Sequence, residues 1–98
     1  MSIEWTAEAV AELDDILSYI AAQDIGAAAL VAERVIVAEA SIILFPKAGR
    51  YDVETDTYDR FIPKTRIVLS YAIRDEAIWI ITTWHTSRDP KTKPVRTR

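Results

Sequence analysis

IVLSYAIRDEAIWIITTW, residues 67–84, is the stretch that decides the fold. It holds two runs of β-branched and aromatic residues, 67–73 and 77–84, on either side of a short charged segment. This arrangement predicts a β-hairpin, because both runs favour extended backbone and the segment between them suits a turn.

Two further short strands are predicted outside the hairpin. Phe61 and Ile62 stand directly before Pro63, which suits a strand that is short or lies at a sheet edge. Ile3 and Glu4 are candidates for another short strand at the start of the chain. The sequence therefore predicts a small antiparallel sheet of three to four strands.

Two helices are predicted between the first short strand and the others. Thr6 is a suitable N-cap for the first helix, in which apolar residues recur at helical spacing over 9–20. Asp24 is a suitable cap for a second helix, which runs to about Phe45 and is stopped by Pro46. Helices joined so closely form a hairpin, so the predicted fold class is α+β, with an N-terminal helical hairpin packed on the sheet.

The second helix is apolar on more than one side. Its main apolar stripe contains Val31 and Val35, and further apolar residues lie partly outside that stripe. A helix of this kind needs cover on several sides, and a chain this short has few elements to give it. One interpretation is an exposed apolar strip that awaits another chain. The alternative is that the first helix and the sheet cover the second helix between them.

The length of 98 residues, half of them apolar, allows one domain with one core. We expect this domain to span residues 1–89 and to be followed by a basic, flexible tail over 90–98. The absence of cysteine excludes disulfides and thiolate metal sites. No signal peptide and no membrane-spanning run is evident, so we expect a soluble, cytoplasmic chain with no membrane partner.

The net charge of −3 conceals a division between the two parts of the chain. Residues 1–59 hold three Lys or Arg against twelve Asp or Glu, whereas residues 60–98 hold nine against three. The basic part suggests a face that meets an anion, nucleic acid or an acidic protein. The alternative is only that the helices are rich in acids and the strands in bases.

Most site chemistries are excluded by composition. Asp14 and Asp15 are neighbours on a helix and point about 100° apart, so they cannot converge on one ligand. A single histidine and two glycines leave no metal-binding pattern and no glycine-rich phosphate loop. We therefore predict no metal and no cofactor.

The end of the last predicted strand, residues 84–88, reads WHTSR. Arg66 begins the neighbouring antiparallel strand, so it should lie beside this segment. Cleavage of RNA at the 2′-hydroxyl needs a base, an acid and cations near the phosphate, which His85, Arg66 and Arg88 would supply. The alternative is that His85 packs at the strand end and that the arginines pair with acids or keep the domain soluble.

Several segments, in order and spacing, resemble the RelE/ParE plasmid-stabilisation toxins. They are Trp5-Thr6-Ala7-Glu8-Ala9, Leu13-Asp14-Asp15-Ile16, Tyr19-Ile20-Ala21, Phe45-Pro46-Lys47-Ala48-Gly49-Arg50, Pro63-Lys64-Thr65-Arg66 with Tyr71, and Trp84-His85-Thr86-Ser87-Arg88. The Phe-Pro-x-x-Gly-Arg turn and the Trp-His-x-x-Arg ending are the most specific of these.

The resemblance implies a compact α+β toxin that a separately encoded antitoxin wraps through apolar contacts. Operator DNA would be reached only through that antitoxin. The residues expected to bind the antitoxin are Leu30, Val31, Val37, Ile43 and Leu44.

The family has a branch that cleaves messenger RNA on ribosomes, RelE, and a branch that inhibits DNA gyrase without nuclease chemistry, ParE. The helix pattern and the Trp-His-x-x-Arg ending look more like ParE. The lysine-rich strand of the RelE nucleases is replaced here by residues 58–62, and no aromatic residue follows Trp84 to act as their terminal acid. Tyr58 also departs from the arginine of many ParE-type chains. A net acidic chain is poorly suited to a ribosomal site lined with phosphates.

Three functions therefore remain open at this point. A gyrase inhibitor, which is not an enzyme, is preferred; its target-binding residues would be Arg60, Lys64, Arg66 and Arg88. The first alternative is an endoribonuclease with Arg66, His85 and Arg88 as catalytic residues. The second is an inactive relic that still binds the antitoxin.

Overall fold

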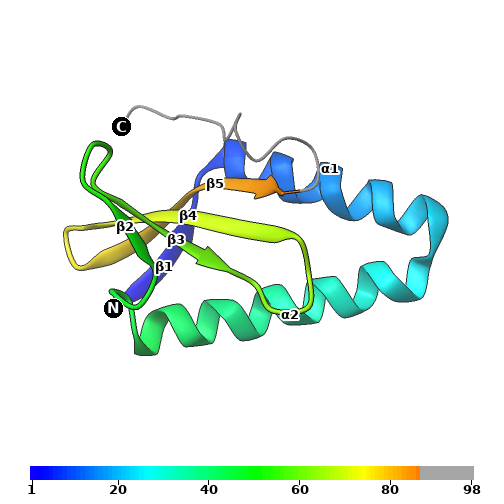
Figure 1. Ribbon diagram of the computed structural model, residues 1–98, viewed down its shortest axis with the longest axis horizontal. Coiled ribbons are helices and arrows are strands. Elements are labelled where there is room, and N and C mark those ends of the chain that lie inside the picture. The colour runs from blue at the N-terminus through cyan, green and yellow to red at the C-terminus, as the bar shows by residue number, and fades with distance from the viewer. Residues whose placement is uncertain (87–98) are drawn as a thin grey trace.

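The computed structural model describes residues 1–86, and within them the chain forms two helices and one five-stranded sheet (Figure 1). In chain order the elements are β1 (Ser2–Trp5), α1 (Ala7–Gln23), α2 (Ile25–Leu44), β2 (Arg50–Asp52), β3 (Thr57–Phe61), β4 (Ile67–Arg74) and β5 (Ala77–His85). The predicted α+β class, the helical hairpin and the β4–β5 hairpin are confirmed.

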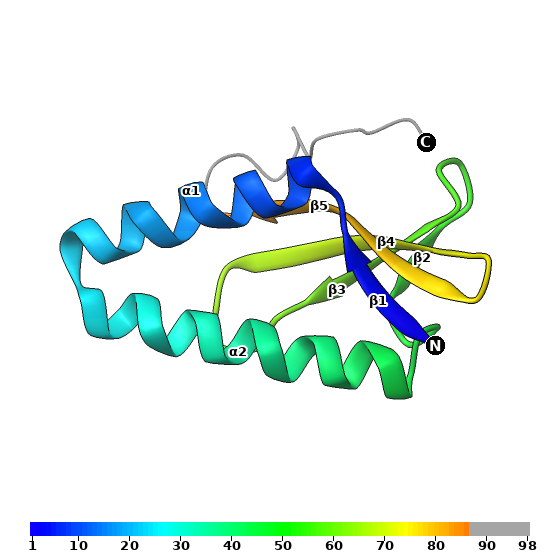
Figure 2. The same cartoon turned by 180° about the vertical axis from the view of Figure 1, so that it is seen from behind.

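The sheet has the strand order β1-β5-β4-β3-β2, and two of its features differ from the prediction. It has five strands within residues 1–86 rather than three to four, because β2, for which no strand was predicted, pairs with β3. It is also mixed, since β1 runs parallel to β5 while the other pairs are antiparallel. Figure 2 shows β1 at the edge of the sheet, leading directly into α1.

Both helices begin at the predicted caps. The Thr6 hydroxyl accepts a hydrogen bond from the Ala9 amide at 3.1 Å, and Asp24 Oδ1 accepts one from the Ala27 amide at 3.1 Å. Each cap satisfies an amide that the first helical turn leaves without a backbone partner. Asp24 also ends α1, because its amide makes the last helical bond, to the Ile20 carbonyl, while its own backbone is extended at φ −159° and ψ 102°. One residue therefore turns the chain between two helices.

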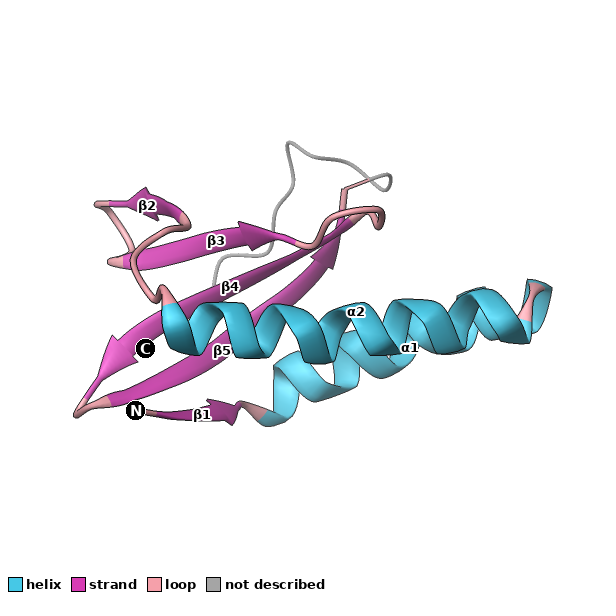
Figure 3. Ribbon diagram, turned by 90° about the horizontal axis from the view of Figure 1, so that it is seen from below, coloured by secondary structure: helices cyan, strands magenta, loops and turns pink. Residues whose placement is uncertain are grey.

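The helical hairpin packs on one face of the sheet, and the core lies between them (Figure 3). Fully buried members of this core include Ile42 from α2, Leu69 and Tyr71 from β4, and Ile80 from β5. Thr83 fixes the position of α1, because its hydroxyl donates to the Ala9 carbonyl at 3.2 Å. In the described part of the chain, neither helix is long and apolar enough to cross a membrane.

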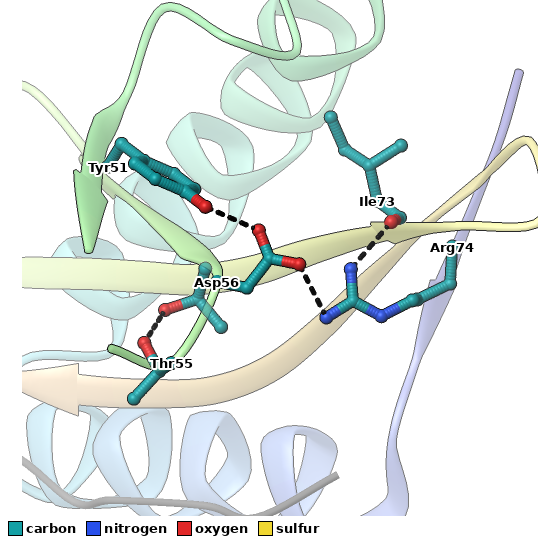
Figure 4. Close-up of polar contacts among 6 residues, drawn as sticks. Tyr51, Thr55, Asp56, Ile73 and Arg74 are labelled. Carbon is teal, nitrogen blue, oxygen red and sulfur yellow. Dashed lines mark hydrogen bonds and ion pairs between the residues drawn. The ribbon is translucent and has the colours of Figure 1, made fainter. Parts of the chain in front are cut away.

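A small polar network ties the hairpin of β2 and β3 to the far end of β4 (Figure 4). The Tyr51 hydroxyl donates to Asp56 Oδ1 at 2.7 Å, and Asp56 Oδ2 lies 3.2 Å from Arg74 Nη2. Thr55 and Thr57 share a further hydroxyl contact of 2.6 Å beside it. Because β2 is a three-residue edge strand, these side chains add contacts that its short backbone ladder lacks.

Replacing Asp56 with asparagine is expected to lower the pKa of Tyr51. The hydrogen bond that the phenol donates to the Asp56 carboxylate raises this pKa above its ordinary value of 10.0, since it favours the protonated form. Removing the carboxylate removes that preference. An ultraviolet titration, with Tyr51→Phe used to identify the signal, measures the shift.

The same contact sets a direction for stability against pH. A tyrosine whose folded-state pKa is raised stabilises the fold fully below pH 10.0, and that contribution is lost as the pH rises through the folded-state value. The difference in stability between the native chain and Asp56→Asn should therefore shrink in alkaline solution. A difference that grew above pH 10 would contradict this assignment.

Candidate functional site

The turn between β3 and β4 presents Lys64 and Arg66 to solvent. It is held by Thr65, whose hydroxyl donates to the Ile62 carbonyl at 2.7 Å and accepts from the Ile67 amide at 3.1 Å. Lys64 adopts a left-handed backbone with φ 63°, which a tight turn requires here. The two exposed cations are therefore carried on a backbone that is fixed by hydrogen bonds.

A third cation, Arg34 of α2, reaches this turn, and sequence reasoning did not select it. Its Nη1 donates to the Lys64 carbonyl at 3.5 Å. We use the name cationic turn for Arg34, Lys64 and Arg66. Arg34 is the only basic residue within α2, and a single cation in an apolar helix could have marked it as a candidate site residue.

The structure confirms that Arg66 lies beside the end of β5. The Thr86 amide donates to the Arg66 carbonyl at 2.7 Å, and the next residue of β4, Ile67, pairs with His85. Arg88, the third residue of the predicted ribonuclease site, lies outside the described residues, as does the predicted basic tail 90–98.

Arg66 and His85 have different surroundings, although their backbones are neighbours. Ile67 belongs to the core, and Thr83 bonds to α1, so His85 lies on the helix-covered side. Arg66 directly precedes β4 in an exposed bend, whereas His85 is half-buried. The backbone brings the two residues together, but it does not place both side chains in one environment.

Arg60, a predicted target-binding residue, is engaged by the end of α2. Its Nη1 donates to Ser41 Oγ at 2.9 Å and its Nη2 to the Phe45 carbonyl at 2.7 Å. A cation at this place suits the negative end of the helix dipole, and it gives a second donor to the Phe45 carbonyl, which also accepts from the Ala48 amide at 3.1 Å. Arg60 therefore holds the end of α2 in place and offers little to another molecule.

The turn after α2 explains the Phe-Pro-x-x-Gly-Arg motif in structural terms. The Tyr71 hydroxyl donates to the Pro46 carbonyl at 2.8 Å, and burial raises the pKa of Tyr71. A Cβ on Gly49 would lie only 2.7 Å from the Asp59 carbonyl oxygen, so β2 reaches β3 only with glycine here. Because Tyr71 is buried and its hydroxyl donates to the Pro46 carbonyl, it holds the turn and is not placed to donate a proton to a substrate.

The second candidate surface is the side of α2 that faces away from the core. We call it the outer face of α2, and it consists of Ala29, Leu30, Glu33, Ile36, Val37, Ala40, Ile43 and Leu44, all exposed. Of its large side chains, Ile36 is 64 % exposed, Val37 67 % and Leu44 71 %. Glu33 is its single charge.

The outer face includes four of the five residues predicted to bind an antitoxin. The fifth, Val31, is half-buried and packs against the core, so it does not belong to this surface. Ile36 was missed, although it lies seven residues before Ile43 on the same side of the helix. The predicted exposed apolar strip is thus present, with one residue exchanged.

Among residues 1–86 no group of three or more histidine, aspartate or glutamate side chains is arranged to hold a metal ion. The two candidate surfaces therefore consist of a turn with three cations and an apolar helix face. Both are suited to contacts with another macromolecule.

Comparison with known proteins identifies the family. The family model described as the ParE toxin of the type II toxin–antitoxin system, parDE, matches residues 3–90. A solved structure described as the chromosomal ParDE TA system from P. aeruginosa is similar in fold, with a TM-score of 0.74 at 19 % sequence identity. That match covers 87 % of this chain and 95 % of the other. A search of curated proteins found no match. The family model spans most of the sequence, and the chain therefore belongs to the ParE toxins of type II toxin–antitoxin systems.

Proposed function

We propose that this chain arrests growth by binding and inhibiting DNA gyrase, and that a cognate antitoxin neutralises it by covering the outer face of α2. Membership of the ParE toxins supports the first part. His85 lies on the helix-covered side of the sheet, whereas Arg66 lies in an exposed bend outside β4, and this separation is the observation that carries the choice of inhibitor over nuclease. Acid–base cleavage of RNA needs both groups at one phosphate.

The charges support the same choice. The exposed cations of the cationic turn stand on a chain whose net charge is −3, and a general affinity for phosphates needs a wider basic surface. A few fixed cations suit a local acidic patch on a protein partner better. Lys64 and Arg66, with Arg34 beside them, are the proposed target-binding residues.

The outer face of α2 is the proposed antitoxin surface. Its apolar side chains run along most of one helix, which is the arrangement that an amphipathic helix of a partner recognises. The antitoxin would bring operator DNA to the complex, since the exposed cations of residues 1–86 are few and the net charge of the chain is −3. Saturating antitoxin should raise the thermal stability of the chain, because a ligand that binds only the folded state stabilises it.

Replacing Arg66 with alanine is expected to raise the concentration of toxin needed to inhibit gyrase by about tenfold, equivalent to ~1.4 kcal/mol. The side chain is exposed and its backbone bonds are kept, so the fold should not change. Lys47→Ala is the matched control, because it removes one exposed cation from a different turn. Equal loss in both variants would mean that only net charge matters.

A supercoiling assay with purified components tests the proposed target. The full chain is added to gyrase, ATP and relaxed plasmid, and in parallel to ribosomes translating a labelled message. Loss of negative supercoiling with intact message is the expected result. Normal supercoiling with a cleaved message would establish the ribonuclease instead, and no effect in either assay would leave an inactive antitoxin-binding relic.

A further inference from the structure

The outer face of α2 has a seven-residue repeat. Adjacent apolar pairs occur at 29–30, 36–37 and 43–44, and between them the middle of the face is occupied by Glu33 and Ala40, again seven apart. A repeat of seven keeps the same side of a helix facing one partner helix. The pattern therefore describes a seam for another helix and is more ordered than a random patch of exposed apolar residues.

The seam is complementary to itself when the second helix runs in the opposite direction. If the two-fold axis passes between Ile36 and Val37, the pair 29–30 of one copy lies opposite the pair 43–44 of the other. Glu33 then lies opposite Ala40. Ala29 then lies opposite Leu44 and Leu30 opposite Ile43, so every layer of the seam contains at least one large side chain and two layers set it against alanine.

We propose that the free chain forms an antiparallel homodimer through the outer face of α2. A two-fold interface must bring the same patch of both copies together, and this patch fulfils that condition in one register. The proposal concerns the chain alone and does not need the proposed gyrase or antitoxin binding to be correct.

Charge selects the antiparallel register over the parallel one. In a parallel pair the two Glu33 carboxylates would lie side by side at the centre of an apolar seam, which is unfavourable. In the antiparallel pair they are separated along the helix by seven residues, about 10 Å. That distance is larger than the Debye length of about 8 Å at physiological salt, so the two carboxylates repel each other less than they would in the parallel pair.

The dimer should be weak. One helix face of about 22 Å from residue 29 to residue 44 is smaller than the roughly 800 Å² per partner of a standard interface. We expect dissociation in the micromolar range. If the antitoxin binds the outer face as proposed, the dimer and the antitoxin complex exclude each other. This consequence rests on the proposed function, but the test by the mass of the free chain is independent of it.

Analytical ultracentrifugation of the purified chain tests the dimer. The mass is measured at concentrations up to about 500 µM, a range that covers the dissociation of a weak interface. The native chain is expected to approach twice the mass of one copy as the concentration rises. Val37→Glu and Val37→Lys are each expected to remain monomeric, because position 37 meets its own copy beside the axis. An equal mixture of the two variants should restore the dimer through opposite charges.

Circular dichroism shows whether these variants keep the native fold, which the exposure of Val37 predicts. Val53→Glu is the matched control, since Val53 is also an exposed valine but lies in the turn between β2 and β3, and this variant should dimerise like the native chain. A native chain that stays monomeric throughout the range overturns the proposal. So does a dimer that both Val37 variants leave unchanged.

Disulfide formation tests the register, and the chain has no cysteine of its own to interfere. In the antiparallel dimer Ala29→Cys should cross-link with Leu44→Cys in a mixture, while neither variant cross-links with itself. Two cysteines must bring their Cβ atoms within about 4.5 Å, and like positions would be about 22 Å apart. Self cross-linking of either variant in preference to the mixed pair would show a parallel arrangement and overturn the proposed register.

Discussion

Replacing Ile42 with alanine is expected to lower the free energy of unfolding by about 2–5 kcal/mol, the usual cost of removing a large buried aliphatic side chain. Ile42 is 0 % exposed and lies on the side of α2 that packs on the sheet. Alanine would leave a cavity between the helix and the strands. For a domain of this size the melting temperature should fall by roughly 10 °C or more.

Ile36→Ala is the matched control on the same helix. It removes the same atoms from a side chain that is 64 % exposed, so its cost should stay within about 0.5 kcal/mol. Denaturant unfolding, measured at concentrations where the chain is monomeric, compares the two variants. Similar losses for Ile36 and Ile42 would mean that α2 is rotated from the orientation described here.

Replacing both Leu30 and Leu44 with glutamate is expected to abolish neutralisation by the antitoxin while leaving toxicity intact. Full burial of each leucine in a complex contributes about 1.5–3 kcal/mol, so losing both should weaken binding at least roughly a hundredfold. A charge buried in their place adds a further cost. Titration of the antitoxin into the purified variant measures the affinity, and co-expression measures the rescue of growth.

The control for this variant is Val53→Glu, which adds a charge to an exposed apolar site away from α2. It should bind the antitoxin with native affinity. Undiminished neutralisation of the Leu30 and Leu44 double variant would place the antitoxin elsewhere on the toxin. Loss of toxicity in the same variant would indicate that the outer face of α2 also meets the target.

The helices and the main hairpin were predictable because their signals are local. Thr6 and Asp24 cap helices in the structure as their side chains suggest, and the runs over 67–84 form β4 and β5. β2 was missed since it has three residues, too few for an alternating pattern, and depends on pairing with β3. The parallel direction of β1 follows from long-range contacts with β5 that no local pattern encodes.

For the candidate sites, the sequence predicted which backbone segments are neighbours but not the surroundings of their side chains. Antiparallel pairing correctly placed Arg66 beside the end of β5. It did not show that Arg66 would lie in an exposed bend while His85 is half-buried, because the turn before β4 sets where the strand begins. Val31 was wrongly assigned to the exposed side of α2, and Ile36 was left out of it. Helical spacing shows that α2 has two apolar sides, but it does not show which of them the sheet covers. Arg34 joins the cationic turn through a contact across 30 positions of sequence.

Induced expression of the chain alone and together with its antitoxin tests the proposed gyrase target, when growth, plasmid supercoiling and the integrity of messenger RNA are followed in the same cells. Growth arrest with relaxed or broken DNA and intact messages, relieved by the antitoxin, is the expected result. Arrest with fragmented messages and normal supercoiling would contradict it and would return Arg66 and His85 to a catalytic role.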